Sequence, residues 1–204
     1  MDYQSIIDKY YPIGEVGGRS DPQPPRSALP LGSSKNLGGS ALRKLLLIHS
    51  RQVADRCLKI AKAHPELRLD VEFLEEAAML HDIGIFRCDA PSIQCFGTEP
   101  YIRHGYIGGQ ILREEGWVRH ALVCERHTGT GLSREQIERQ QLPLPLDVRF
   151  EPEALEEQVV CYADKFYSKT HPERERTVVE AAQSLEKFGQ EGVNRFLGWA
   201  KMFE

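Results

Sequence analysis

Long hydrophobic runs are missing from this sequence. Uninterrupted apolar stretches, such as the four residues from Leu45 to Ile48, are short, whereas a membrane-spanning helix needs about 20. The amino-terminal segment MDYQSIIDKYYP also lacks the basic residues followed by an apolar stretch that mark a secretory signal. We therefore expect a cytoplasmic protein with no membrane partner.

Excess positive charge and paired cysteines are missing as well. The 26 Lys and Arg residues are outnumbered by 30 Asp and Glu residues, so the net charge is −4. A protein that binds nucleic acid through bulk electrostatics is usually basic, and we expect no nucleic-acid partner. The five cysteines include no Cys-x-x-Cys pair, which argues against disulfides and a zinc–thiolate site. We expect them to be small apolar core residues.

The content of Gly, Pro and Ser divides the chain at about residue 40. Residues 12–40 contain six Gly, five Pro and five Ser, a composition that buries too little apolar surface to offset its ordering entropy. We therefore expect residues 1–40 to be a short helix followed by an irregular loop or linker, and residues 41–204 to be one folded domain. The glycines contain no GxxxxGK[ST] motif, which argues against a phosphate-binding loop of that type.

After residue 40, apolar residues recur at steps of three and four, the period of an amphipathic helix. This period predicts helices at residues 41–63, 70–83, 104–115, 117–127, 133–141, 153–169, 177–188 and 191–203. Asp70 and Ser133 are the residues that we expect to cap two of these helices. No segment has the alternation of a half-buried strand, so the predicted fold class is all-α.

Six side chains that can bind metal fall on the apolar faces or at their ends: His49, His81, Asp82, His104, His127 and Asp164. A lone histidine on such a face is more often an ordinary core residue, and a lone buried carboxylate is usually ion-paired. Four imidazoles and two carboxylates together need a common partner, which divalent cations supply because each side chain donates a lone pair. Six ligands are too many for one catalytic metal, and they fit two metals that share a bridging ligand.

The order of these residues resembles a known pattern. His49, then the dipeptide His81-Asp82, then Asp164 resembles the H…HD…D pattern of the HD-domain metal-dependent phosphohydrolases. The flanking segments, which span residues 41–170, are similar too: LLLIHSRQVAD, AAMLHDIGIF, IRHGYIGGQILREEG, CERHTGTGLS and CYADKFYSK. The added His104 and His127 resemble the binuclear branch of the family, among its small single-domain HDIG members. The chain lacks the HHE and GYP signatures of cyclic-di-GMP hydrolases, which argues against that substrate.

The resemblance implies an HD-domain helical bundle with the metal site in its core. The first metal would be held by His49, His81, Asp82 and Asp164, and the second by His104 and His127, with Asp82 bridging. The implied cofactors are two divalent transition-metal ions, Fe or Mn ahead of Zn, Co, Ni or Mg, because histidine ligands favour transition metals. The implied catalytic residues are His81 and Asp82, since two close cations lower the pKa of a bridging water and produce hydroxide at neutral pH.

The implied activity is that of a metal-dependent phosphohydrolase, a phosphodiesterase or nucleotide hydrolase. Its substrate would be a small phosphorylated, nucleotide-like molecule with a phosphoester or phosphoanhydride bond. Two alternatives stay open: a di-iron HD-type oxygenase that uses O₂, and a non-catalytic metal-dependent nucleotide sensor. No feature of the sequence specifies an oligomeric state.

Polar residues beside the predicted ligands are candidates for binding phosphate. Arg103 and Arg126 each precede a ligand, Lys165 follows one, and Thr128 begins the segment TGTG after another. Arginine binds phosphate through two parallel hydrogen bonds. The alternative for each charged residue is a surface position or an ion pair, and for Thr128 a turn cap. Arg51, Arg87 and Lys169 lie within six residues of ligands, and His120 is a candidate hydrogen-bond partner of one.

Overall fold

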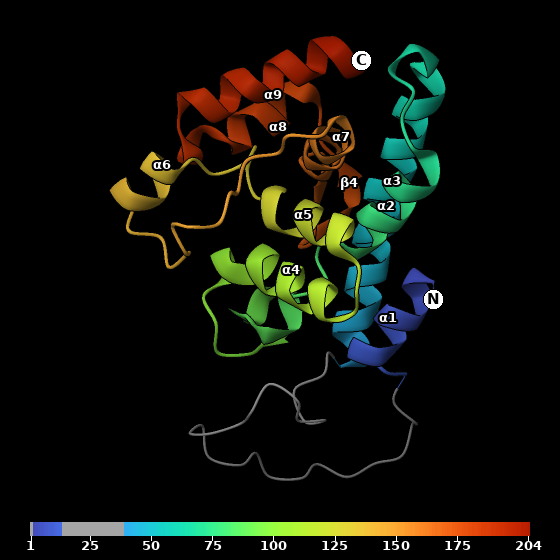
Figure 1. Cartoon of the computed structure of the whole chain (residues 1–204), viewed down its shortest axis with the longest axis vertical. Helices are drawn as coiled ribbons and strands as arrows, with labels where there is room; N and C mark the ends of the chain where they lie inside the picture. The colour runs from blue at the N-terminus through green and yellow to red at the C-terminus, as the bar shows by residue number, and fades with distance from the viewer. Residues whose placement is uncertain (1, 14–38) are drawn as a thin grey trace, which may run out of the picture.

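A computed structural model describes residues 2–13 and 39–204, so most of the segment rich in Gly, Pro and Ser lies outside the described residues. Helices dominate the described part (Figure 1), which confirms the predicted all-α class. The α-helices are Tyr3–Tyr10 (α1), Ser40–Ala63 (α2), Val71–Leu80 (α3), His104–Glu114 (α4), Val118–Arg126 (α5), Arg134–Arg139 (α6), Leu155–Asp164 (α7), Val178–Ser184 (α8) and Gln190–Phe203 (α9). In this part of the chain, no helix is long and apolar enough to cross a membrane.

The long helix α2 organises the bundle. It packs against α3 and α7, while α4 and α5 pair with each other and α8 lies against α9. The helix α1 packs on α3 with Ile6 and Ile7 fully buried, and the Tyr11 hydroxyl that follows it donates to the Ile83 carbonyl over 3.0 Å. All five cysteines are free and buried, as predicted for small apolar core residues.

The expected caps begin two of the helices. The Phe73 amide donates to Asp70 Oδ1 over 3.1 Å at the start of α3, and the Gln136 amide donates to Ser133 Oγ over 3.2 Å at the start of α6. Each cap satisfies one of the backbone donors that a helix leaves free at its first turn. The beginnings of α3 and α6 therefore follow from single side chains in the sequence.

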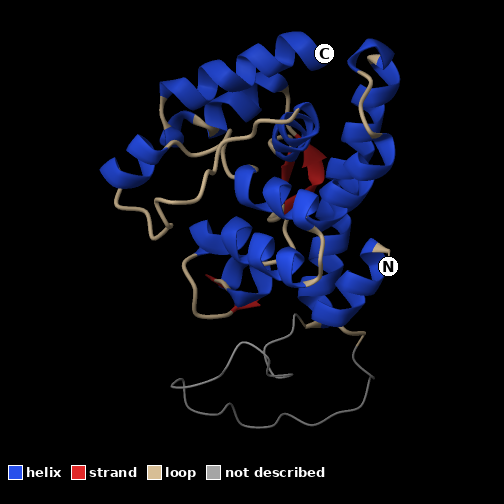
Figure 2. Ribbon diagram, viewed as in Figure 1, coloured by secondary structure: helices blue, strands red, loops and turns tan. Residues whose placement is uncertain are grey.

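Strands are present although the sequence predicts none. Figure 2 shows two small ribbons: Asp89–Ala90 (β1) pairs with Cys95–Phe96 (β2), and Tyr167–Ser168 (β3) pairs with His171–Glu175 (β4). β1, β2 and β3 have two residues each, too few for an alternating pattern, and the five residues of β4, HPERE, do not alternate between apolar and polar. Short 3-10 helices complete the chain at Pro65–Leu67 (η1), Ile85–Arg87 (η2), Pro91–Ile93 (η3), Tyr101–Arg103 (η4) and Glu186–Phe188 (η5).

Two predicted helices end earlier than their apolar pattern suggests. The helix expected over 70–83 ends at Leu80, so His81 and Asp82 lie in the turn that follows it. The helix expected over 153–169 ends at Asp164, because the Arg176 amide donates to the Phe166 carbonyl over 2.8 Å and continues the pairing of β3 with β4. The first early ending places the predicted ligands His81 and Asp82 in a turn, and the second makes the predicted ligand Asp164 the last residue of its helix.

Candidate metal centre

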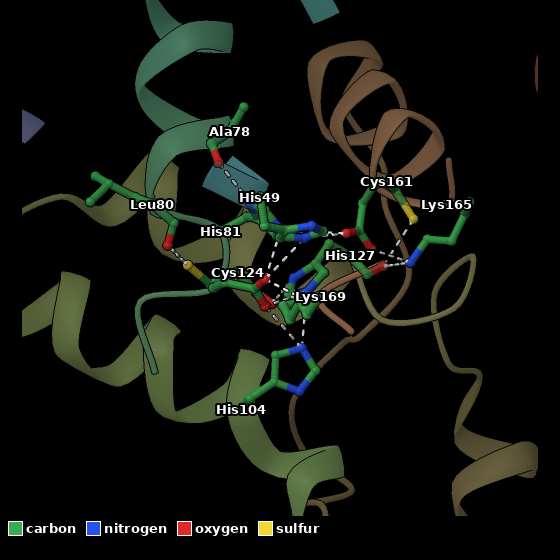
Figure 3. A network of polar contacts seen from close by, with 12 residues as sticks. His49, Ala78, Leu80, His81, His104, Cys124, His127, Cys161, Lys165 and Lys169 are labelled. Carbon is green, nitrogen blue, oxygen red and sulfur yellow. Dashed lines mark hydrogen bonds and ion pairs between the residues drawn. The ribbon is translucent and has the colours of Figure 1, made fainter. Parts of the chain in front are cut away.

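The six predicted ligands meet in the interior of the bundle. His49 lies on α2, His104 is the first residue of α4, and Asp164 is the last residue of α7. The turn after α3 supplies His81 and Asp82, and His127 directly follows α5. Four of the five segments contribute at a helix end, where a side chain can turn towards a shared point (Figure 3).

The ligand atoms form two groups that share one residue. The first group comprises His49, His81, Asp82 and Asp164, and the second comprises Asp82, His104 and His127, with the donor atoms of each group within 4.8 Å of one another. Asp82 is fully buried and offers Oδ2 to the first group and Oδ1 to the second. This is the arrangement that two cations with a bridging carboxylate require.

Backbone carbonyls fix the orientation of three histidine rings. The Nδ1 atoms of His81, His104 and His127 lie 2.6, 2.7 and 2.8 Å from the carbonyl oxygens of Ala78, Tyr101 and Cys124, each three residues earlier in the chain. A carbonyl oxygen only accepts hydrogen bonds, so Nδ1 carries the proton in each ring. The Nε2 atom is then left with the lone pair that a metal binds, and it faces the cluster.

The second group has no internal way to satisfy its nitrogen atoms. His104 Nε2 and His127 Nε2 lie 3.0 Å apart, and each lies 3.5 Å from Asp82 Oδ1. Two lone pairs and a carboxylate oxygen repel one another unless a cation or a proton lies among them. No hydrogen bond reaches His81 Nε2 or Asp82 Oδ1 from the described residues. These buried nitrogen and oxygen donors fit divalent transition metals.

The first group is closer packed around its two carboxylates. His49 Nε2 lies 2.9 Å from Asp164 Oδ1 and 3.3 Å from Asp82 Oδ2, and His81 Nε2 lies 3.1 Å from Asp82 Oδ2. Burial lowers the pKa of His81, but the carboxylates of Asp82 and Asp164 outweigh burial and raise this pKa to about 9. The group therefore strongly attracts positive charge.

The two histidines of the second group favour the neutral form. Burial, reinforced by the neighbouring His127 ring, lowers the pKa of His104 to about 3. Burial also lowers the pKa of His127. Both rings are therefore neutral at pH 7, the protonation state in which imidazole binds a metal.

A lysine lies against each carboxylate of the cluster, the fully buried Asp82 and the half-buried Asp164. Lys169 Nζ is 2.6 Å from Asp82 Oδ2, and Lys165 Nζ is 2.5 Å from Asp164 Oδ2 and donates to the His127 carbonyl over 3.1 Å. Burial raises the pKa of Asp82, but Lys169 and then His81 hold it well below its usual range. Burial likewise raises the pKa of Asp164, and Lys165 and His49 lower it well below its usual range. Both carboxylates are therefore ionised.

A cavity of about 420 Å³ opens beside the cluster. His104, His127 and Asp164 form part of its wall, so the cluster is open to a small molecule on this side. Thr128 and Lys165, two of the four predicted phosphate-binding residues, line this cavity. Its other lining residues include Tyr101, Tyr167, Lys169, Arg176, Ser184, Leu185, Lys187 and Phe188.

The structure does not bring the two arginines predicted to bind phosphate to the cavity. Arg103 is paired with Glu99 over 2.8 Å, and Arg126 is buried and paired with Glu157 over 2.9 Å. Neither arginine lines the cavity. Their positions next to His104 and His127 mislead because adjacent residues of a helix point about 100° apart. Of the alternatives that the sequence offers, the ion pair describes both residues.

His120 is not a hydrogen-bond partner of a predicted ligand. Its ring lies between Phe73 and Trp117, with centroid distances of 4.8 and 4.5 Å, and its Nε2 is 3.0 Å from Glu76 Oε2. Two cationic residues of the cavity, Arg176 and Lys187, are absent from the residues that the sequence suggests for phosphate binding, whereas Lys169 is among the cations near a ligand. Only Lys169 has a sequence signal, its place five residues after Asp164.

Comparisons with known proteins agree with this geometry. Residues 46–168 match the HD domain family, and the six ligands all lie in that range. An uncharacterized protein of Methanocaldococcus jannaschii is 35% identical over 134 residues, which cover 61% of this chain and 71% of that protein. No solved structure matches the chain.

Two longer relatives carry the name tRNA (cytidine(56)-2'-O)-methyltransferase. The protein from Thermoplasma volcanium is 32% identical over 124 residues, which cover 60% of this chain and 32% of that protein. The protein from Picrophilus torridus is 30% identical over 125 residues, which cover 61% of this chain and 32% of that protein. The chain thus spans about a third of the length of these two relatives.

Proposed function

The chain belongs to the HD domain family, and on that premise we propose that it is a phosphohydrolase that uses two metal ions to cleave a small nucleotide-like substrate. Membership of the family supports a metal-dependent, hydrolase-type activity. The bond cleaved would be a phosphoester or a phosphoanhydride. We assign the catalytic domain to residues 41–204, with α1 as an amino-terminal helix packed on it.

The observation that carries this proposal is the sharing of Asp82 between two groups of ligand atoms. In the proposed assignment, one cation is held by His49, His81, Asp82 and Asp164, and the other by His104, His127 and Asp82. Two such cations, when bound, lower the pKa of a water between them and withdraw charge from a phosphoryl group. The chain supplies neutral imidazoles at His104 and His127, ionised carboxylates and a buried cluster from which bulk water is largely excluded.

The charge of the cavity supports an anionic substrate. The whole chain has a net charge of −4, yet Asp164 is the only carboxylate among the described residues that line the cavity. Four cationic side chains share the lining with it: Lys165, Lys169, Arg176 and Lys187. Charge of one sign in a partly enclosed site raises the local concentration of an oppositely charged ligand. A phosphate ester fits this environment.

The aromatic part of the cavity supports a nucleotide-like substrate. Tyr101, Tyr167 and Phe188 line it together with the aliphatic Ile93 and Leu185. Tyr101 already stacks on His104, with ring centroids 4.6 Å apart and an angle of 19° between the rings. Aromatic and aliphatic lining of this kind gives a base or sugar an apolar surface on which to pack.

The deciding experiment joins metal analysis to a turnover screen. The purified chain should contain about two transition-metal ions, and it should hydrolyse at least one of three substrate types. A cyclic nucleotide would give a nucleoside monophosphate, a nucleoside monophosphate would give nucleoside and phosphate, and a dinucleoside polyphosphate would give two mononucleotides. Asp82→Asn is the matched control, since it removes the shared charge and keeps the side-chain shape. Uptake of O₂ by the iron-loaded chain without hydrolysis of any of these substrates would replace the hydrolase with the oxygenase. Tight nucleotide binding without turnover would replace it with the sensor.

A further inference from the structure

We infer that the cavity contains a second anion site, formed by Arg176 and Lys187, and that the substrate carries a second phosphate group apart from the one that reacts. This inference rests on the proposed function for the reacting phosphate. The evidence for the second site is that, of the four cationic side chains lining the cavity, two pair with described carboxylates and two do not.

Lys165 and Lys169, the two cations next to the ligand cluster, already have carboxylate partners. Lys169 lies against Asp82 and Lys165 against Asp164, at 2.6 and 2.5 Å. Each lysine therefore balances the charge of a predicted metal ligand. The inner part of the cavity thus has no surplus positive charge from its side chains alone.

Among the described residues, Arg176 has no such carboxylate partner. It is half-buried between β4 and α8, and its NH1 group donates to the Lys165 carbonyl over 3.1 Å. Within the described ranges, no carboxylate lies at ion-pair distance from it, whereas Arg174, two residues earlier, is paired with Glu180. A guanidinium has five N–H donors, so several remain to bind an anion that enters the cavity.

Lys187 adds a second unmatched cation at the same cavity. It lies on η5, is exposed, and makes no ion pair with any described carboxylate. Its Nζ lies 5.0 Å from the centre of the neighbouring Phe188 ring, which also lines the cavity. The hydroxyl groups of Thr128 and Ser184 line the same space and offer further hydrogen bonds to phosphate oxygens.

Arg176 and Lys187 belong to a part of the chain that lies beyond the end of the family match. The match ends at residue 168, and Arg176, Ser184 and Lys187 all follow it. The conserved chemistry of a family and the choice of substrate are often supplied by different segments, because loops around a fixed site vary independently of it. We therefore assign the choice of a bisphosphorylated substrate to residues 176–188.

The first test measures phosphate binding with no metal present. Inorganic phosphate is titrated into chelator-treated protein and followed by phosphorus NMR. The wild-type chain should bind it saturably, and Arg176→Gln with Lys187→Gln should weaken binding at least about tenfold, the usual scale for charge-assisted hydrogen bonds. Glutamine can still donate to the Lys165 carbonyl, and the exposed Lys187 can be changed without disturbing the fold. Lys201→Gln, an exposed lysine on α9 away from the cavity, is the control and should bind as wild type does.

The second test compares two ligands on metal-loaded protein by calorimetry. Adenosine 3′,5′-bisphosphate should bind at least about tenfold more tightly than adenosine 5′-monophosphate, and the double variant should lose this preference. Absence of saturable phosphate binding by the chelated wild type, or equal binding by the double variant, overturns the second site. Neither result touches the proposed hydrolysis, which fails only if the metal-loaded chain turns over no phosphate ester.

Discussion

The Nε2 atoms of His104 and His127 face each other at 3.0 Å while the opposite nitrogen of each ring is bound to a backbone carbonyl. The carbonyls of Tyr101 and Cys124 prevent either ring from turning away. Two helix ends, the start of α4 and the end of α5, therefore hold a preformed pair of nitrogen ligands next to Asp82. Such preorganisation reduces the cost of ordering the site when a metal binds.

This relationship predicts how removing one ring changes metal content. His104→Ala or His127→Ala should lower the bound metal from about two ions per chain towards one, because the other four ligands still hold the first ion. Turnover should fall by orders of magnitude, since a water beside one cation has a higher pKa than a water between two. Elemental analysis and a turnover assay of each variant measure both effects.

His120→Ala is the matched control for these two variants, because its ring contacts Phe73, Trp117 and Glu76 and no predicted ligand. It should keep both metals. One ion in wild type, together with one ion and full activity in the His104 variant, would contradict the binuclear centre and favour a mononuclear hydrolase.

Asp82→Asn should abolish hydrolysis and leave the fold largely intact. The amide has the shape of the carboxylate but no charge, so it is a poor bridge between two cations and a weak partner for Lys169 at 2.6 Å. Turnover and circular dichroism check the two parts of this prediction. Asp55→Asn is the control: it changes an exposed carboxylate that pairs with Arg51 on the surface of α2, and it should keep full activity. A rate in the Asp82 variant above about a tenth of the wild-type rate would show that Asp82 does not bridge. Such a rate means that the substitution raises the activation barrier by less than about 1.4 kcal/mol.

The predicted ligands come together because each one belongs to a strong local pattern. His49 lies on a long apolar face, and His81-Asp82 and Asp164 each end a helix whose period is clear in the sequence. The phosphate-binding residues have no such pattern. Arg103 and Arg126 are next to ligands in the sequence but point to Glu99 and Glu157 instead.

Lys169, Arg176 and Lys187 reach the cavity through tertiary structure that leaves no period in the sequence. Lys169 lies in the turn between β3 and β4, and β3 has only the residues Tyr167–Ser168. Lys187 lies on η5, a helix of three residues. Elements this short are set by their packing on the rest of the bundle, so local propensity cannot place their side chains.

Gly84 should not tolerate a methyl group. A Cβ atom there would lie 2.4 Å from the His104 carbonyl oxygen and 2.5 Å from the Gly108 amide nitrogen, both backbone atoms of α4. Gly84→Ala should therefore push α4 away, lower the free energy of unfolding by about 1–3 kcal/mol and weaken the second metal site through His104. Denaturant unfolding and metal analysis measure these two effects together.

Gly198→Ala is the matched control for the change at Gly84. Gly198 is exposed on α9 with nothing within 4 Å of its added Cβ, so alanine should leave metal content unchanged and raise stability by up to about 1 kcal/mol. A Gly84 variant as stable as wild type, with two metals bound, would show that α4 does not need this close approach.

His120 should make the stability of the chain depend on pH below 6.5. Its side chain is 13% exposed between Phe73 and Trp117, and burial lowers its pKa below the usual 6.5 although Glu76 acts in the opposite direction. Above pH 6.5 the ring is neutral in both the folded and the unfolded chain. As the pH falls below 6.5, the unfolded chain takes up a proton that the folded chain resists, so the free energy of unfolding decreases.

The measurement compares wild type with His120→Gln by urea unfolding from pH 7 to pH 5. Groups outside this pair titrate in both proteins, so the difference between the two curves reports His120 together with its pairing to Glu76. Wild type should lose more stability than the variant as the pH falls, by at most about 1.4 kcal/mol per pH unit. Glu76→Gln removes the group that opposes the effect of burial and should make the loss steeper. Curves that stay parallel would show that burial does not control this ring, and a wild type that gains stability relative to His120→Gln would show that the Glu76 carboxylate, 3.0 Å away, outweighs burial.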